Sequence, residues 1–523
     1  MIAYALVNGP LPKAGLIVVA ALAGGAMLAP GSRPRALAML ALLILTPVLL
    51  LADVWASPRL ATLHHHPLEA VAAGALGVLV VLALAIPIAR RPWLIAPLVV
   101  FTLPFRIPIT LGGTTSNLLV PLYLVLASGT LAYVASVLGF PRRCAADPEE
   151  FNPGGTGPRA AVWLERLLAA YVLLYAIQAT YSLDLQLALQ QVVFFYAPFT
   201  LAFCLLRRLR WSGELVRMCL LVAVSLALLF SLVGFVEYAT RSLFLNAKLI
   251  ATNQNHAYFA VNSVFYDSNI FGRFLALVMV VLAATLLHDR RWREQVAAAG
   301  VLAVLWVGVV LSLSRSSLGA LLAGLAVLAA VRWRISRAVL AVLGVVVVAG
   351  AAVALSPHTF GVEQGANGVS SGRGSLVSGG IHMFGQRPLW GYGSGSFQVE
   401  YLHQHPPCSA ASTASCSPGG VGDSHTLPVT IAAEQGLIGE LIYLGLLAAA
   451  ALTLIPGVRS NPVRAAVLAA FVALVVHTLV YDDFLSDPIS WTLLGMGVAL
   501  ARAPRAEVAE RKAARLRPEA LPA

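Results

Sequence analysis

Residues 372–401 read GRGSLVSGGIHMFGQRPLWGYGSGSFQVEY, and residues 423–444 read DSHTLPVTIAAEQGLIGELIYL. With the Cys-bearing polar run between them, they form the one long polar interruption in an otherwise almost continuously apolar chain. A polar stretch of roughly 70 residues between two apolar spans is too long for a tight connection, so we expect it to carry function. It divides the chain into a long N-terminal block and a shorter C-terminal block of apolar segments.

The composition on either side of this stretch determines the class of protein. Apolar residues make up 59% of the 523 residues, charged residues 11%, and the mean hydropathy is +0.83. A water-soluble globular protein of this composition could not cover its surface with polar groups. We therefore predict an all-α, polytopic bundle of about 12 to 15 transmembrane helices with one large extracytoplasmic loop. The apolar windows lie near residues 14–30, 36–52, 68–89, 93–104, 117–139, 163–180, 189–206, 215–238, 270–288, 295–312, 317–331, 336–355, 426–455, 463–480 and 484–501.

Basic residues cluster in alternate connections between these windows, beginning with Arg33 and Arg35 and ending with the Arg-rich tail from Arg502. By the positive-inside rule these connections face the cytoplasm, and the intervening ones, including the long loop, face outward. The sequence therefore predicts a multi-pass protein of the inner (cytoplasmic) membrane whose active site lies on the extracytoplasmic face. The predicted organisation is transmembrane helices with short loops in residues 1–355, an extracytoplasmic loop carrying site residues in 356–425, C-terminal transmembrane helices in 426–501 and a cytoplasmic tail in 502–523.

The net charge is +12, from 35 Lys and Arg against 23 Asp and Glu. Nucleic-acid binding is not expected, because the basic residues fall in short clusters between apolar runs, which is typical of anchoring at the cytoplasmic face. The sequence has no P-loop, no GxGxxG opening a helix and no Cys or His pairs at zinc spacing, so we expect no cofactor and no metal. The run His64, His65 and His66 lacks an acidic partner pattern. A disulfide between Cys408 and Cys416 requires a loop in an oxidising compartment.

Three arginines are candidates for binding an anion. Arg315 lies in residues 311–324, LSLSRSSLGALLAG, at the predicted outer end of a span, where an arginine must either snorkel to the interface or pair with something inside the protein. The four flanking serines add hydroxyl donors, which favours the second interpretation. Arg373 and Arg387 lie in the long loop, where a solvated role is the usual one. Arginine is nonetheless the side chain best shaped to fork two donors onto a phosphate.

His425 stands where the loop enters an apolar helix. A histidine at that boundary either caps the helix or accepts a proton near neutral pH, as activation of a hydroxyl nucleophile requires. Gly391, Gly393 and Gly395 predict a turn-rich segment that allows close backbone approach. No P-loop lysine follows them, so a phosphate cradle is only weakly indicated.

Taken in order, LSLSRSSLGALLAG, GRGSLVSGGIHMFGQRPLWGYGSGSF and SHTLPVTIAAEQGLIGELIYLGLL resemble the bacterial O-antigen ligase and O-antigen polymerase family of integral-membrane glycosyltransferases. That family has a Ser-Arg motif at a span end, an Arg early in a large periplasmic loop, a Pro-x-x-Gly-x-Gly-x-Gly-x-Phe run and a His opening the following helix. Here these fall on Arg315, Arg373, residues 388–397 and His425. The family usually has Asn after that histidine, whereas this chain has Thr426.

A weaker likeness extends to Asn269, which precedes a span, and to Arg106 in FRIPITLGG. The resemblance implies a donor glycan carried on undecaprenyl pyrophosphate, a glycan or lipid acceptor, and transfer outside the cytoplasmic membrane without nucleotide sugar or metal. It implies that Arg315, Arg373 and His425 are catalytic. The implied substrate-binding residues are Arg387, Gly391, Gly393, Asn269 and Arg106.

Two other classes of function remain as alternatives. A polytopic transporter, or a flippase of lipid-linked glycans, would be expected to carry ionisable groups near mid-membrane and internal repeats. The spans contain few such groups, Glu237 and Arg273 lie near span ends, and no repeat is evident. A non-catalytic assembly protein would not need Arg and His gathered on one face.

Overall fold

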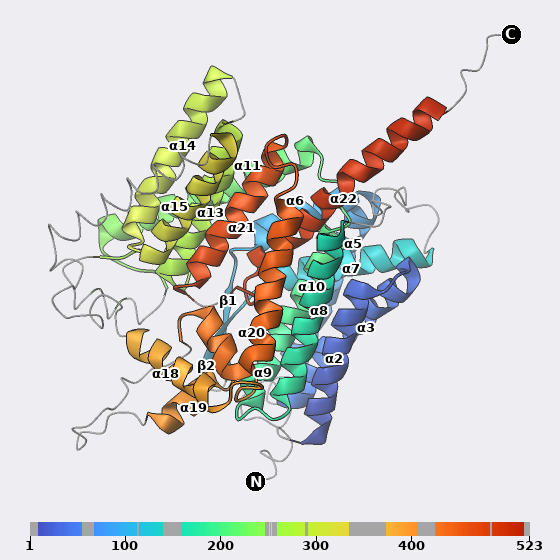
Figure 1. The fold of residues 1–523 in the computed structure, drawn as a ribbon, viewed down its shortest axis with the longest axis vertical. Helices are drawn as coiled ribbons and strands as arrows, with labels where there is room; N and C mark the ends of the chain where they lie inside the picture. Colours follow the sequence, from blue (N-terminus) through green and yellow to red (C-terminus); the bar gives the residue numbers. More distant parts are fainter. Residues whose placement is uncertain are drawn as a thin grey trace.

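A computed structural model describes residues 9–54, 67–111, 114–139, 158–245, 250, 253, 259–287, 291–333, 373–405, 424–481 and 484–516. Within these residues the chain is a bundle of helices, with α18 and α19 together at the end where α20 begins (Figure 1). The helices are α2 (Pro10–Leu28), α3 (Ser32–Val54), α5 (Pro67–Arg90), η2 (Pro92–Leu94), α6 (Ile95–Thr102), α7 (Val120–Leu138), α8 (Arg159–Ala179), α9 (Leu185–Gln191), the π-helix η4 (Val192–Tyr196), α10 (Ala197–Leu206), α11 (Gly213–Thr240), α13 (Ser268–Leu286), α14 (Trp292–Leu311), α15 (Arg315–Arg332), α18 (Arg373–Gln386), α19 (Phe397–Gln404), α20 (Leu427–Leu454), α21 (Pro462–Thr478) and α22 (Pro488–Leu516).

The described part of the chain contains 11 helical segments long and apolar enough to cross a membrane, and two shorter apolar helices at Pro92–Thr102 and Pro462–Thr478. The prediction of a polytopic, all-α bundle is therefore confirmed. The predicted window at 336–355 lies outside the described residues.

A short antiparallel hairpin interrupts the helices where the sequence predicted only a connection. Strand β1 (Ile107–Leu111) pairs with β2 (Thr114–Leu118), with Ile107 opposite Leu118 and Leu111 opposite Thr114. Isoleucine alternates with Pro and Thr in β1, and the sequence between the strands is Gly-Gly, a pattern typical of a two-residue hairpin turn. A span-length hydropathy window does not detect so short an element.

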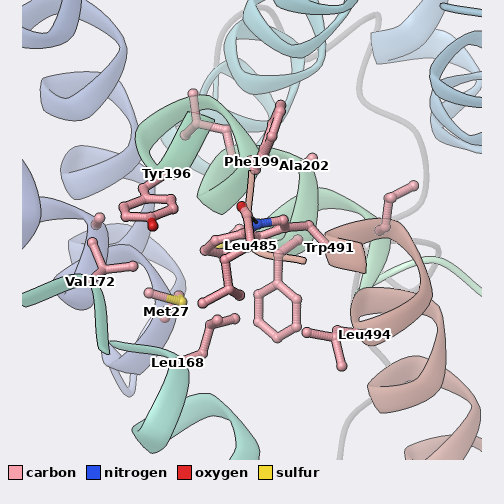
Figure 2. Packing of buried hydrophobic residues seen from close by; sticks show 14 of the residues in the cluster. Met27, Leu168, Val172, Tyr196, Phe199, Ala202, Leu485, Trp491 and Leu494 are labelled. Carbon is pink, nitrogen blue, oxygen red and sulfur yellow. Dashed lines mark hydrogen bonds between the residues drawn. The ribbon is translucent and has the colours of Figure 1, made fainter. Parts of the chain in front are cut away.

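The main apolar core lies where α2, α8, α10 and α22 meet (Figure 2). Trp491 is fully buried, its ring centroid lies 6.4 Å from that of Phe199, and its Nε1 donates to the Leu485 carbonyl at 2.8 Å. Lipid is as apolar as leucine, so packing and internal hydrogen bonds, rather than exclusion of water, hold such helices together. Trp491 satisfies both requirements, because its ring packs and its only donor is used.

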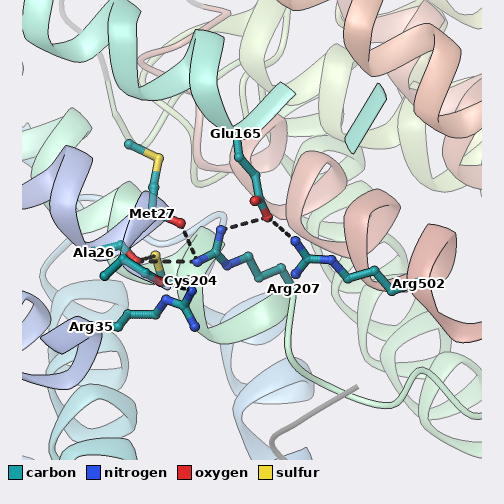
Figure 3. A network of polar contacts seen from close by, with 8 residues as sticks. Ala26, Met27, Arg35, Glu165, Cys204, Arg207 and Arg502 are labelled. Carbon is teal, nitrogen blue, oxygen red and sulfur yellow. Dashed lines mark hydrogen bonds and ion pairs between the residues drawn. The ribbon is translucent and has the colours of Figure 1, made fainter. Parts of the chain in front are cut away.

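A buried polar network joins the same four helices near one end of α8 (Figure 3). Glu165 accepts from Arg207 at 2.8 Å and from Arg502 at 2.7 Å. Arg207, only 1% exposed, also donates to the carbonyl of Met27 at 2.8 Å, in the last turn of α2. The sequence placed Arg207 in a basic surface connection, but Glu165 and the carbonyl groups at the end of α2 allow this guanidinium to be buried.

Candidate functional site

The glycine-rich segment of the loop is fastened to a break in α20. The amide of Gly393 donates to the Glu434 carbonyl at 2.8 Å, and the Glu434 carboxylate accepts from Gly395 at 2.8 Å and from Phe397 at 3.0 Å. Two residues further on, Gly436 leaves helical geometry with φ 67° and ψ −164°. The main chains of Gly391 and Gly393 thus pack closely against the main chain of α20 at Glu434. The assignment of these two glycines to substrate binding stays a prediction.

Replacing Gly391 by alanine should destabilise the fastened loop. Its φ is +66°, and a Cβ there would lie 2.3 Å from the main chain of Glu434. Left-handed strain and a forced main-chain shift should together cost about 1–3 kcal/mol. The measurement is thermal unfolding of the purified protein, with limited proteolysis of the loop.

The matched control is Gly385→Ala, which lies within α18 and whose Cβ would have no neighbour within 4 Å. That change should be neutral or slightly stabilising. Equal unfolding temperatures for the two variants would show that the Gly391 contact does not contribute to stability.

The Ser-Arg motif at the start of α15 is held by Asn269. Ser314 caps α15 through a 3.2 Å bond from the Ser317 amide, and its hydroxyl donates to Asn269 Oδ1 at 2.8 Å. The Ser317 hydroxyl donates to the Asn269 carbonyl at 3.2 Å. These hydrogen bonds connect the Asn269 segment with the Ser-Arg motif, which the sequence linked only through the family resemblance. Arg315 is exposed as the first residue of α15, where its own charge and the helix N-terminus both favour an anion.

His425 lies beside a second set of side chains that connects it to this helix start. Its ring centroid is 6.4 Å from that of Tyr481, whose hydroxyl donates to Asp267 Oδ2 at 2.9 Å. Asp267 also caps α13, accepting from the Asn269 amide at 2.7 Å. His477 packs edge-on against Tyr481, with ring centroids 5.4 Å apart. Its Nε2 lies 3.1 Å from the hydroxyl of Ser316.

The result is one continuous polar cluster, which we call the outer cluster: His425, Tyr481, Asp267, Asn269, His477, Ser314, Ser316 and Ser317. Asp267, His477 and Tyr481 were not predicted as site residues from the sequence. Asp267 stands two residues before Asn269 and is a typical helix-capping residue, which is a usable signal. His477 and Tyr481 belong to a distant connection, and only the fold brings them to His425.

Two buried ionisable groups have structural partners. Arg273 pairs with Asp487 at 2.8 Å, both side chains being 2% exposed. The Glu237 carboxylate accepts from the amides of Ser263 at 2.7 Å and Asn262 at 3.2 Å. Buried charges of this kind mark transport pathways when they line a cavity. Here they fix chain connections instead, which weakens the transporter alternative.

The remaining predicted residues belong to other segments or lie beyond the described part of the chain. Arg387 is exposed, and its Cζ lies 4.3 Å from the centroid of the Tyr392 ring. Burial raises the pKa of the Tyr181 hydroxyl, and the positive charge of Arg387 acts in the opposite direction. Arg106 directly precedes β1. Arg373 opens α18, but its side chain lies outside the described part, as do His64–His66, Cys408 and Cys416. No group of three or more potential metal ligands occurs among the described residues.

These features define a polytopic membrane protein with a cluster of His, Tyr, Asp, Asn and Ser side chains beside an exposed arginine at a helix start. Comparison with known families agrees with the motifs: residues 298–444 match the family described as O-antigen ligase. The match runs from α14 through Arg315 and the loop to His425 and the middle of α20. The match supports a relationship of this part of the chain to the O-antigen ligase and polymerase family. None of the curated proteins matches the chain.

Proposed function

We propose that the protein transfers a glycan from undecaprenyl pyrophosphate to an acceptor hydroxyl, on the outer face of the cytoplasmic membrane, in cell-surface polysaccharide biosynthesis. One observation carries the proposal. His425 and the Ser-Arg start of α15, more than a hundred residues apart in sequence, are joined through Tyr481, Asp267 and Asn269. A base and a phosphate-binding group are thereby held together, as transfer from a pyrophosphate requires.

In the proposed step, His425 removes the proton from the acceptor hydroxyl as its oxygen attacks the anomeric carbon of the donor. The bond between that carbon and the pyrophosphate oxygen breaks, and the leaving pyrophosphate keeps the electron pair. Arg315 stabilises the charge that accumulates on it, and the N-terminus of α15 adds to the same field. Arg373 and Arg387 supply further positive charge from the loop.

The lipid part of the donor needs an apolar surface. A cavity of about 360 Å³ lies between α3, α7 and the η4–α10 segment, lined almost entirely by carbon, including Pro47, Leu118, Tyr123 and Phe194. Leu118 pairs with Ile107 in the hairpin, the residue directly after Arg106. We propose that an isoprenoid chain occupies this cavity with its phosphate end toward Arg106, the residue that precedes the hairpin.

The proposed function is tested with purified protein, a polyprenyl-pyrophosphate-linked glycan and candidate acceptors, in the presence of EDTA and without nucleotide. Formation of a glycan-extended acceptor and free polyprenyl pyrophosphate is expected. A ligase would extend a lipid or protein acceptor, whereas a polymerase would extend a second lipid-linked repeat. No transfer to any of these acceptors would favour the transporter or flippase alternative.

Arg315→Ala should lose about 2–4 kcal/mol of transition-state stabilisation in this assay, as expected for removal of a charge-stabilising donor. Arg315→Lys should retain part of the rate, because an ammonium keeps the charge but loses the forked contact. The matched control is Arg332→Ala, at the opposite end of the same helix and also exposed. Equal rates for Arg315→Ala and Arg332→Ala would exclude a catalytic role for Arg315.

A further inference from the structure

The end of α8 and the start of the α20 segment after Gly436 lie at the same depth relative to a bilayer. α8 contains 21 residues and ends at Ala179. Beyond its break at Gly436, α20 continues over residues 437–454. At 1.5 Å per residue these segments are roughly 32 Å and 27 Å long, close to the hydrocarbon thickness of a bilayer. Each therefore crosses the membrane about once, and residues 179 and 437 mark one bilayer boundary.

The turn before the glycine run is hydrogen-bonded to both of these helix ends. The Pro388 carbonyl accepts from the Leu437 amide at 2.7 Å. The Trp390 carbonyl accepts from the Tyr181 hydroxyl at 2.8 Å and from Gln178 Nε2 at 3.2 Å. Because the two helices fix the turn from both sides, its height relative to the bilayer follows from theirs.

The side chains at this turn are apolar and turned outward. Leu389 is 58% exposed and Trp390 55%, beside Tyr181 at 44% and Leu183 at 58%. The Pro388–Leu437 bond joins them to the face of α20 that exposes Leu437, Leu441 and Leu444. That face lies within the candidate membrane span and therefore contacts lipid. The exposed residues of the turn thus continue a lipid-facing surface at the level where it leaves the hydrocarbon.

We propose that Leu389, Trp390, Tyr181 and Leu183 form a membrane anchor that inserts into the interfacial layer of the bilayer on the side of the outer cluster. Tryptophan and tyrosine favour this layer, because their rings contact acyl chains while their polar atoms contact water or, as here, protein. The anchor holds α18 and α19 against the membrane surface. It requires only a lipid surface and does not depend on the catalytic assignment.

The test places a fluorescent amino acid, by amber-codon suppression, at position 389 or 390 of the full chain in lipid nanodiscs. Position 386, an exposed glutamine at the end of α18, is the water-facing control, and position 441 is the lipid-facing control. Iodide quenches from water, and lipids brominated near the headgroup or near the chain end quench from two depths. Leu389, Trp390 and Leu441 have exposed side chains, so wild-type unfolding temperatures are expected for these three probes. The Gln386 side chain accepts from Tyr392 and Gln404, so thermal unfolding checks that the probe at 386 leaves the fold intact.

Probes at 389 and 390 should be quenched most by lipids brominated near the headgroup, and several-fold less by iodide than the probe at 386. The probe at 441 should respond most to bromine deeper in the chain. Iodide quenching at 389 and 390 equal to that at 386 would overturn the proposal. Protection from iodide without quenching by either lipid would also overturn it, since a protein contact would then cover the residues.

Discussion

Replacing His425 should reduce glycan transfer by roughly 10²- to 10⁴-fold, the usual share of general acid–base catalysis. The backbone suggests which variant is most informative. His425 has a φ of 54°, a left-handed conformation that asparagine tolerates far better than alanine does. His425→Asn therefore removes the base while keeping the entry into α20, whereas His425→Ala adds local strain. Donor binding should survive in both variants.

The matched control is His403→Ala, because His403 is 81% exposed on α19 and is not a member of the outer cluster. Full activity of His425→Asn would end the general-base assignment.

The second large effect concerns stability. Glu165→Ala should destabilise the folded protein by about 3–5 kcal/mol, because Arg207 would be left buried without its carboxylate partner. The same change removes the partner of Arg502 and so loosens the contact of α22 with α8. Thermal unfolding in detergent, followed at several protein concentrations, measures the effect.

Glu294→Ala is the appropriate comparison, since Glu294 also pairs with an arginine, at 3.1 Å, but with side chains 43% and 78% exposed. An exposed pair of this kind contributes about 0–1 kcal/mol. Similar losses for Glu165→Ala and Glu294→Ala would show that the network in Figure 3 does not hold the four helices together.

Much of the fold followed from hydropathy because a membrane span needs about 20 apolar residues and leaves little freedom in length. The windows at 163–180 and 215–238, for example, correspond to α8 (Arg159–Ala179) and α11 (Gly213–Thr240). The window at 426–455 hid the break at Gly436, because a hydropathy average does not respond to one residue with positive φ.

The outer cluster was only half predictable. His425, Arg315 and Asn269 lie in short motifs, and the order of these motifs along the chain indicates the family resemblance. Tyr481 and His477 carry no local signal, since a tyrosine and a histidine near a span end are more often ordinary interfacial residues. Their importance comes from contacts across three helices, which no short sequence window contains.

The π-helical segment Val192–Tyr196 leads directly into α10, and the carbonyl of Phe194 accepts from the Tyr123 hydroxyl at 2.8 Å. A π segment accommodates one residue more than an α-helix over the same rise. Deleting one of these five residues would remove the extra residue and leave regular α geometry, with α10 in its present orientation. Arg207 would then keep its place beside Glu165, whereas deleting one residue from a regular α-helix turns everything after it by about 100°.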